Sequence, residues 1–91
     1  MLHVWFFYIV RCADSSLYCG VTNDVDERVK KHNAGTGAKY TLAHRPVSLV
    51  YSERCGSLSD ALKREDQVKR WPRAKKERLI SGLNPPAPSP E

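Results

Sequence analysis

The sequence has few cysteines, no long apolar run and no repeated unit. Its three cysteines, Cys12, Cys19 and Cys55, form no CxxC pair, so neither a zinc site nor a disulfide framework is expected. No stretch approaches the roughly 18–20 apolar residues that a membrane-spanning helix requires. The apolar start lacks the basic residues and the small-residue cleavage site of a signal peptide. We therefore expect a cytoplasmic protein whose cysteines are reduced residues in or near the core.

What the 91 residues do contain is an ordinary hydrophobic share of 41% and an excess of basic side chains. Fifteen Lys and Arg against ten Asp and Glu give a formal net charge of +5 at pH 7. The length predicts one small domain. The charge favours an anionic partner, and nucleic acid is the commonest partner of this class.

Three short apolar runs predict a sheet. Residues 4–10 and 17–21 flank a turn cluster at residues 13–16 and predict an antiparallel hairpin, and residues 47–52 predict a third strand. The first strand is expected to be buried on both faces, since polar residues do not alternate through it. Gly20 indicates a bulge, or a place where another backbone or a substrate approaches closely.

Helices are predicted between and after these strands. The first has three candidate caps, Thr22, Asn23 and Asp24, and Asp24 with Glu27 forms an acidic variant of the capping box. This helix is expected to run to about Asn33, before Gly35. Its inward stripe is expected to consist of Val25, Val29 and His32. Residues 34–45 contain two glycines and several basic residues, and are expected to form a loop long enough to have a role.

A second helix is predicted over about residues 59–71, capped by Ser57 or Ser59. Its apolar stripe is expected to hold Leu58, Ala61, Leu62, Val68 and Trp71, and its outer faces Lys63, Arg64, Asp66, Lys69 and Arg70. Pro72 ends this helix and a third is predicted over residues 73–80. Residues 81–91 are proline-rich and are expected to form a disordered tail. The order β-β-α-β-α-α predicts an α+β domain over residues 1–80, with a small three-stranded antiparallel sheet flanked by helices.

Polar residues of a catalytic kind recur through these elements. They are Tyr8 and Tyr18 on adjacent predicted strands, Arg28 and His32 one turn apart on the first helix, and Glu65. Glu65 falls in the middle of the apolar stripe of the second helix, where a carboxylate is costly unless it has a partner.

In this order and spacing the sequence resembles the GIY-YIG nuclease superfamily, and especially its small stand-alone bacterial members. Phe6-Phe7-Tyr8 stands where the GIY motif is expected, and Tyr18-Cys19-Gly20 stands for YIG. The stretch DERVKKHN carries the arginine and the histidine, and ALKREDQVK carries the glutamate. The resemblance extends over residues 4–80.

The resemblance implies a divalent-metal-dependent endonuclease that hydrolyses phosphodiester bonds in DNA, with branched, nicked or damaged DNA in repair or recombination as a possible substrate. Glu65 would bind one Mg²⁺ or Mn²⁺ ion, and Arg28 would bind the scissile phosphate. Tyr8, Tyr18 and His32 would orient or deprotonate the attacking water. The general base is open among these three residues.

Two basic segments are expected to contact the nucleic acid, most of their side chains through phosphate. They contribute Lys39, Tyr40, His44 and Arg45 from the first segment, and Lys69, Arg70, Arg73, Lys75 and Lys76 from the second. Tyr40 and Trp71 are the candidates for stacking on bases.

Two other functions stay open. A non-catalytic nucleic-acid-binding module would keep the fold and use the basic surface. Many family members carry an asparagine shortly after the glutamate's helix, and here the next asparagine is Asn84, a departure that bears on catalytic competence. A protein-interaction module would instead dock a partner through the tail, residues 81–91.

Overall fold

The computed structural model describes residues 4–82. Its elements, in chain order, are β1 (Trp5–Arg11), β2 (Leu17–Thr22), α1 (Val25–Ala34), α2 (Lys39–Ala43), β3 (Ser48–Cys55), α3 (Leu58–Lys69) and α4 (Arg73–Ser81). The predicted order is confirmed, with the short helix α2 added. No helix within residues 4–82 has the length and apolar character needed to cross a membrane. The predicted tail lies outside the described residues, except that Ser81 and Gly82 end α4.

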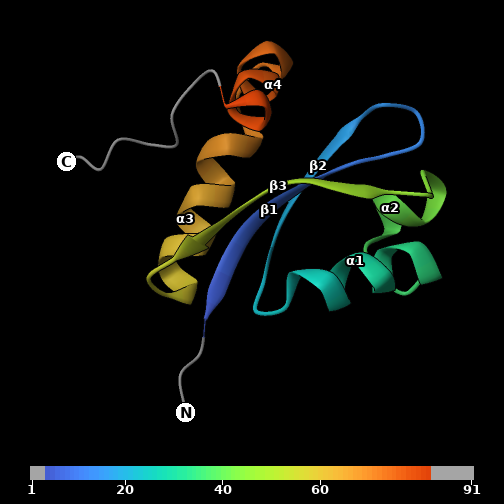
Figure 1. The fold of residues 1–91 in the computed structure, drawn as a ribbon, viewed down its shortest axis with the longest axis horizontal. Coiled ribbons are helices and arrows are strands. Elements are labelled where there is room, and N and C mark those ends of the chain that lie inside the picture. Colours follow the sequence, from blue (N-terminus) through green and yellow to red (C-terminus); the bar gives the residue numbers. More distant parts are fainter. Residues whose placement is uncertain (1–3, 83–91) are drawn as a thin grey trace.

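The three strands form the predicted antiparallel sheet, in the order β2-β1-β3. The central strand β1 is therefore covered on both edges, and β2 lies at one edge of the sheet. Helices α1 and α2 lie on one side of the sheet, and α3 and α4 on the other (Figure 1). This arrangement explains why residues 7–10 of β1 are all buried, as the uninterrupted apolar run predicts.

Alternation along the strands divides the interior into two clusters. Phe7, Ile9 and Cys19 pack with α3 and α4 through Val68 and Leu79. The cluster on the α1 side consists of Tyr8, Val10, Cys12 and Val47, with Tyr18 and Val29 packed against it. Tyr8 and Tyr18 therefore belong to the face covered by α1, whereas the cysteine that follows Tyr18 belongs to the opposite face.

Both ends of α1 follow from the local sequence. The side chain of Asp24 accepts a hydrogen bond from the backbone amide of Glu27 at 3.1 Å, so Asp24 is the cap among the three candidates. Gly35 ends the helix with φ of 88°, a conformation that glycine adopts without strain. Between these ends, His32 is completely buried against the sheet.

Residues 34–45 are not a loop throughout, because Lys39–Ala43 form α2. A helix of five residues has little stability of its own, and its formation depends on tertiary contacts. Here the contact comes from Thr41, which is fully buried and hydrogen-bonded to His32. Propensity and pattern along the sequence do not reveal such a contact.

The predicted stripe of α3 is partly wrong. Arg64, placed on an outer face, is buried, whereas Leu58 and Leu62 are exposed. The guanidinium of Arg64 donates to the carboxylate of Glu53 on β3 at 2.7 Å and lies over the ring of Trp71. Because the sheet supplies a carboxylate at this position, α3 turns the arginine inward and leaves the two leucines in solvent.

Candidate functional site

Three of the predicted site residues meet on the α1 side of the sheet. The hydroxyl of Tyr8 lies 2.9 Å from Nε2 of His32, and Nε of Arg28 donates to the same hydroxyl in a long hydrogen bond of 3.4 Å. Tyr8 comes from the central strand, and the other two come from successive turns of α1. The ring of Tyr18 contacts His32 edge-on, with 5.6 Å between ring centroids.

Gly20 makes room for the ring of Tyr8. The two residues are paired across β1 and β2 in a regular register, so the bulge considered for this position is absent from this strand pair. A Cβ atom on residue 20 would collide with the hydroxyl end of the Tyr8 ring. The group that approaches this glycine closely is therefore a tyrosine side chain of the same sheet.

Replacing Gly20 with alanine is expected to lower the free energy of unfolding by about 1–3 kcal/mol, because the fully buried Tyr8 ring must leave its position. Urea denaturation measures this change. Gly56→Ala is the matched control, since its Cβ would meet only the flexible end of Asp60, at 3.1 Å. Equal losses in the two variants would contradict the packing role of Gly20.

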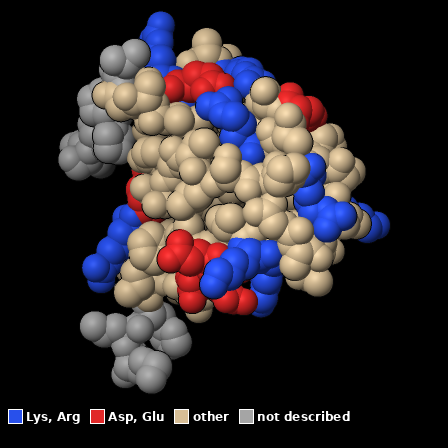
Figure 2. Space-filling view, turned by 45° about the vertical axis from the view of Figure 1, so that its right-hand side comes forward, with Lys and Arg blue, Asp and Glu red and all other residues tan. Residues whose placement is uncertain are grey.

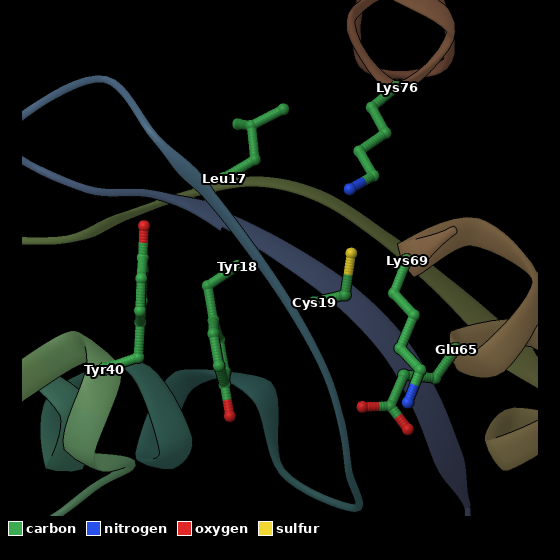
Figure 3. Close-up of a pocket in the computed structure, with 7 residues that line it drawn as sticks. All are labelled: Leu17, Tyr18, Cys19, Tyr40, Glu65, Lys69 and Lys76. Atoms are coloured by element: carbon green, nitrogen blue, oxygen red, sulfur yellow. The ribbon is translucent and has the colours of Figure 1, made fainter. Parts of the chain in front are cut away.

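A hollow of about 440 Å³ lies at the edge of the sheet formed by β2. Its lining residues are Leu17, Tyr18, Cys19, Tyr40, Glu65, Lys69 and Lys76. Figure 3 shows the two tyrosines on one side of β2, with Glu65 and Lys69 on the other and Lys76 reaching in from α4. Both faces of the sheet therefore contribute to one open pocket that straddles the edge strand.

Glu65 is half-buried in the wall of this pocket. Among residues 4–82 it has no ion-pair partner, although basic side chains surround the pocket. No group of three or more His, Cys, Asp or Glu residues gathers anywhere within this range. Glu65 supplies the one carboxylate among the residues that line the pocket.

Burial and Arg28 set the protonation of the site. Burial raises the pKa of Tyr8, and Arg28 opposes this rise through its hydrogen bond and its charge. Burial likewise raises the pKa of Tyr18, against the influence of Arg28 and with that of Glu65. Burial and the charge of Arg28 both lower the pKa of His32. At pH 7 the two tyrosines are thus protonated and His32 is neutral.

The predicted nucleic-acid contacts fall into two kinds of surroundings. Lys69, Lys76 and Tyr40 line the pocket. Other members are held in contacts within the protein: Arg45 with the carbonyls of Asn33 and Leu42, Arg70 with Asp66, Arg73 with Glu77 and the Ser15 carbonyl, and Lys75 over the Trp71 ring. On the face shown in Figure 2, basic side chains lie around the periphery with acidic ones among them.

Tyr40 is not a free stacking platform. His44 is stacked on its ring, with 4.2 Å between centroids, and Tyr18 lies nearly parallel to it at 5.9 Å. His44 is itself held by Asp14, 3.5 Å away. A base that stacks on Tyr40 would have to displace one of these rings. Trp71 is half-buried beneath Arg64 and Lys75, so it offers little free surface either.

Sequence reasoning missed Thr41 and Gly37, which hold His32 from the segment between α1 and β3. Oγ1 of Thr41 lies 2.6 Å from Nδ1 of His32, and a Cβ on residue 37 would collide with the same ring. The available signal was a buried histidine on the inward stripe of α1, since a buried imidazole needs a partner for each nitrogen. The sequence does not show which later residue supplies it.

Comparison with known proteins places these residues in a family context. A sequence model of the GIY-YIG catalytic domain matches residues 4–78. The UPF0213 protein of Staphylococcus aureus strain Mu50 is 57% identical over 75 residues, which cover 82% of this chain and 92% of that protein.

Two solved structures are similar as well. The NMR structure of the UPF0213 protein BH0048 from Bacillus halodurans is 43% identical with a TM-score of 0.57, over 91% of this chain and 88% of that one. The NMR structure of EF2693 from E. faecalis is 35% identical with a TM-score of 0.59, over 88% of this chain and 85% of that one.

Proposed function

Since this chain belongs to the GIY-YIG family of nuclease domains, we propose that it is a divalent-metal-dependent endonuclease that hydrolyses phosphodiester bonds in DNA. The observation that carries the proposal is the pocket at β2. There the carboxylate of Glu65 and the hydroxyl of Tyr18 share one hollow, and Tyr18 contacts the group formed by Tyr8, Arg28 and His32. Branched, nicked or damaged DNA in repair or recombination is the substrate class we propose.

The residues of the pocket fit one Mg²⁺ or Mn²⁺ ion. Magnesium keeps several waters and is commonly bound through one or two carboxylates together with substrate phosphates, and Glu65 supplies one carboxylate in an open pocket. A cation held there would stabilise negative charge on the scissile phosphate and on the leaving 3′ oxygen. Glu65 is thus the residue that we assign to the metal.

The remaining residues bind phosphate and move a proton. Arg28 binds oxygens of the scissile phosphate, as a guanidinium can do in a bidentate manner. Tyr18 lines the pocket and orients the attacking water. His32 is the final acceptor of the proton, because it is the neutral base of the group, whereas burial keeps both tyrosines protonated. Tyr8 connects His32 to the rest of the site.

Lys69 and Lys76 extend the binding site along the backbone of the nucleic acid. Both line the pocket from the side of α3 and α4, where they meet the phosphates next to the scissile one. Such contacts are independent of sequence and weaken with salt. We therefore propose that the protein recognises the structure of the DNA and not its base sequence. We also propose a cytoplasmic location, where the three thiols stay reduced.

The test is a cleavage assay on labelled duplex, flap and junction DNA in Mg²⁺ or Mn²⁺. The same preparation with a chelator, and the Glu65→Ala variant purified in the same way, serve as blanks. Metal-dependent product that exceeds both blanks on at least one substrate is the expected result. If no substrate is cut above the level of Glu65→Ala, the enzyme proposal fails. Salt-sensitive DNA binding that needs neither metal nor Glu65 would then identify a non-catalytic binding module.

Replacing Arg28 with glutamine is expected to lower kcat/KM for DNA cleavage by about 10²–10³-fold, since a charged donor to the phosphate is lost. It also removes a positive charge that lowers the pKa of His32. Cleavage requires neutral His32 and falls as the pH drops through this pKa, so the acid limb of the pH profile should move to higher pH.

The profile is measured for both proteins from about pH 5 to 9. Lys30→Gln, on the exposed face of the same helix, is the control for net charge and should keep the wild-type limb. An acid limb that stays in place or moves to lower pH in Arg28→Gln would show that His32 is not the group that must be neutral.

A further inference from the structure

Thr41 closes a chain of hydrogen bonds that begins at Arg28 and passes through the interior of the protein. Oγ1 of Thr41 lies 2.6 Å from Nδ1 of His32, and Nε2 of the same ring lies 2.9 Å from the hydroxyl of Tyr8. Thr41 and His32 have no exposed surface, and Tyr8 is 1% exposed. Water therefore does not compete for these bonds, and the positions of the hydrogens depend on the protein's own donors and acceptors.

The carbonyl of Ala38 fixes the direction of this chain. The hydroxyl of Thr41 has a single hydrogen, which it donates to the Ala38 oxygen at 3.0 Å. Only lone pairs of Oγ1 then face Nδ1 of His32, so Nδ1 must carry a hydrogen. A neutral histidine has one ring hydrogen, which leaves the lone pair on Nε2. The hydroxyl of Tyr8 therefore donates to Nε2.

The other end of the chain agrees with this direction. The guanidinium of Arg28 can only donate, and its Nε lies 3.4 Å from the Tyr8 oxygen. That oxygen accepts from Arg28 while its own hydrogen goes to His32, so every group meets a partner of the opposite kind. With the other tautomer, lone pairs of Nδ1 and Oγ1 would face each other unless the bond between Thr41 and Ala38 were broken.

We propose that Thr41 is a positioning residue that holds His32 as its Nδ1–H tautomer, so that Nε2 is the acceptor for the hydroxyl proton of Tyr8. This role rests on the proposed nuclease function, in which His32 takes up a proton. When the O–H bond of Tyr8 breaks, the proton joins the lone pair of Nε2 and leaves a phenolate and an imidazolium. The imidazolium donates from both nitrogens, so the bond from Nδ1 to Thr41 persists and no hydroxyl has to rotate.

The segment that carries Thr41 also fixes the ring in place. Gly37 lies against His32 so closely that a Cβ would collide with Nδ1. The ionisable groups that face the ring are Tyr8 from β1, Tyr18 from β2 and Arg28 from α1. Burial and the positive charge of Arg28 both lower the pKa of the imidazole and keep the ring neutral. Only a neutral ring has two alternative tautomers. Residues 34–45 thus fix the position of His32. The length of this segment indicated only that it has a role.

The experiment is a long-range ¹H–¹⁵N NMR correlation of the histidine side chains, recorded on the free 91-residue protein at neutral pH. The coupling pattern of each ring distinguishes the two neutral tautomers. Thr41→Val keeps the shape of the side chain and removes its oxygen, and Thr41→Ser keeps the hydroxyl. We expect the Nδ1–H pattern for His32 in the wild type and in Thr41→Ser, and its loss in Thr41→Val.

An Nε2–H pattern for His32 in the wild type would overturn the proposal, and so would an unchanged Nδ1–H pattern in Thr41→Val. The wild-type measurement decides the tautomer even if Thr41→Val does not fold. In cleavage assays, a loss of roughly tenfold or more is expected in Thr41→Val, by analogy with the groups that orient metal-binding histidines, with recovery in Thr41→Ser. The NMR measurement uses neither DNA nor metal. A protein that shows the predicted tautomer and cuts no DNA would therefore refute the nuclease function and leave the hydrogen-bond assignment intact.

Discussion

Replacing Glu65 with glutamine is expected to lower the rate constant for DNA cleavage by about a thousandfold. The variant keeps the size of the side chain in the pocket and removes the charge that would hold the cation. Metal ions contribute several kcal/mol of stabilisation to a phosphoryl transition state, and about 4 kcal/mol corresponds to a factor of roughly 10³. Single-turnover cleavage in Mg²⁺ and Mn²⁺ measures the loss separately from DNA binding.

The sign of this effect separates two roles for Glu65. Its charge raises the pKa of Tyr8 and of Tyr18, so its removal should ease deprotonation at these hydroxyls. If Glu65 were only an electrostatic neighbour of the tyrosines, the variant would cleave as fast as the wild type or faster. Asp60→Asn is the matched control, because this carboxylate is exposed on the same helix and does not line the pocket. It is expected to cleave at nearly the wild-type rate.

Replacing Arg64 with methionine is expected to lower the free energy of unfolding by about 3 kcal/mol. Breaking a buried ion pair leaves an uncompensated charge, which costs about 3–5 kcal/mol, and we take the lower end because Glu53 keeps 22% of its side chain exposed. The variant also loses the hydrogen bond to Gln67 at 3.0 Å and the contact with Trp71. The free energy of unfolding of native proteins is typically about 5–15 kcal/mol, so the expected loss is a large share of the total.

The double variant Glu53→Gln, Arg64→Met tests the physical reason. It removes both charges, so no ion is left in the interior, and its loss should be clearly smaller than that of Arg64→Met alone. Urea denaturation of the wild type, both single variants and the double variant gives the four free energies of unfolding of a double-mutant cycle. A double variant that is less stable than Arg64→Met would show that packing, and not the orphaned charge, accounts for the loss.

The fold was predictable where one pattern acts over many residues. The apolar run of β1, the hairpin turn after it and the caps of α1 are local signals, and all three lead to the observed elements. The prediction failed at Arg64 because its burial depends on Glu53, eleven positions away on a strand. It failed at α2 for the same kind of reason, since a buried hydrogen bond to His32 holds this short helix.

The predicted constellation specifies residues but not their placement. Spacing and motif order singled out the five polar residues, and the structure brings Tyr8, Arg28 and His32 into hydrogen-bond contact. The sequence did not show that Tyr18 and Glu65 line one pocket from opposite sides of the edge strand, because strand order is a long-range property. Nor did it show that His44 and Tyr18 occupy the faces of Tyr40. Such stacking depends on how α2 packs on the sheet.

The ion pair between Arg64 and Glu53 also predicts where loss-of-function mutations should occur outside the pocket. Successive residues of a helix point about 100° apart, so the anchoring of Arg64 to β3 sets the direction in which the next residue, Glu65, leaves α3. Glu53 lies on the strand at the far side of the sheet from β2, and we expect its bond to Arg64 to influence the orientation of that carboxylate. A screen for mutants that have lost the proposed cleavage activity is therefore expected to recover changes at Glu53, outside the pocket, with compensating changes at Arg64.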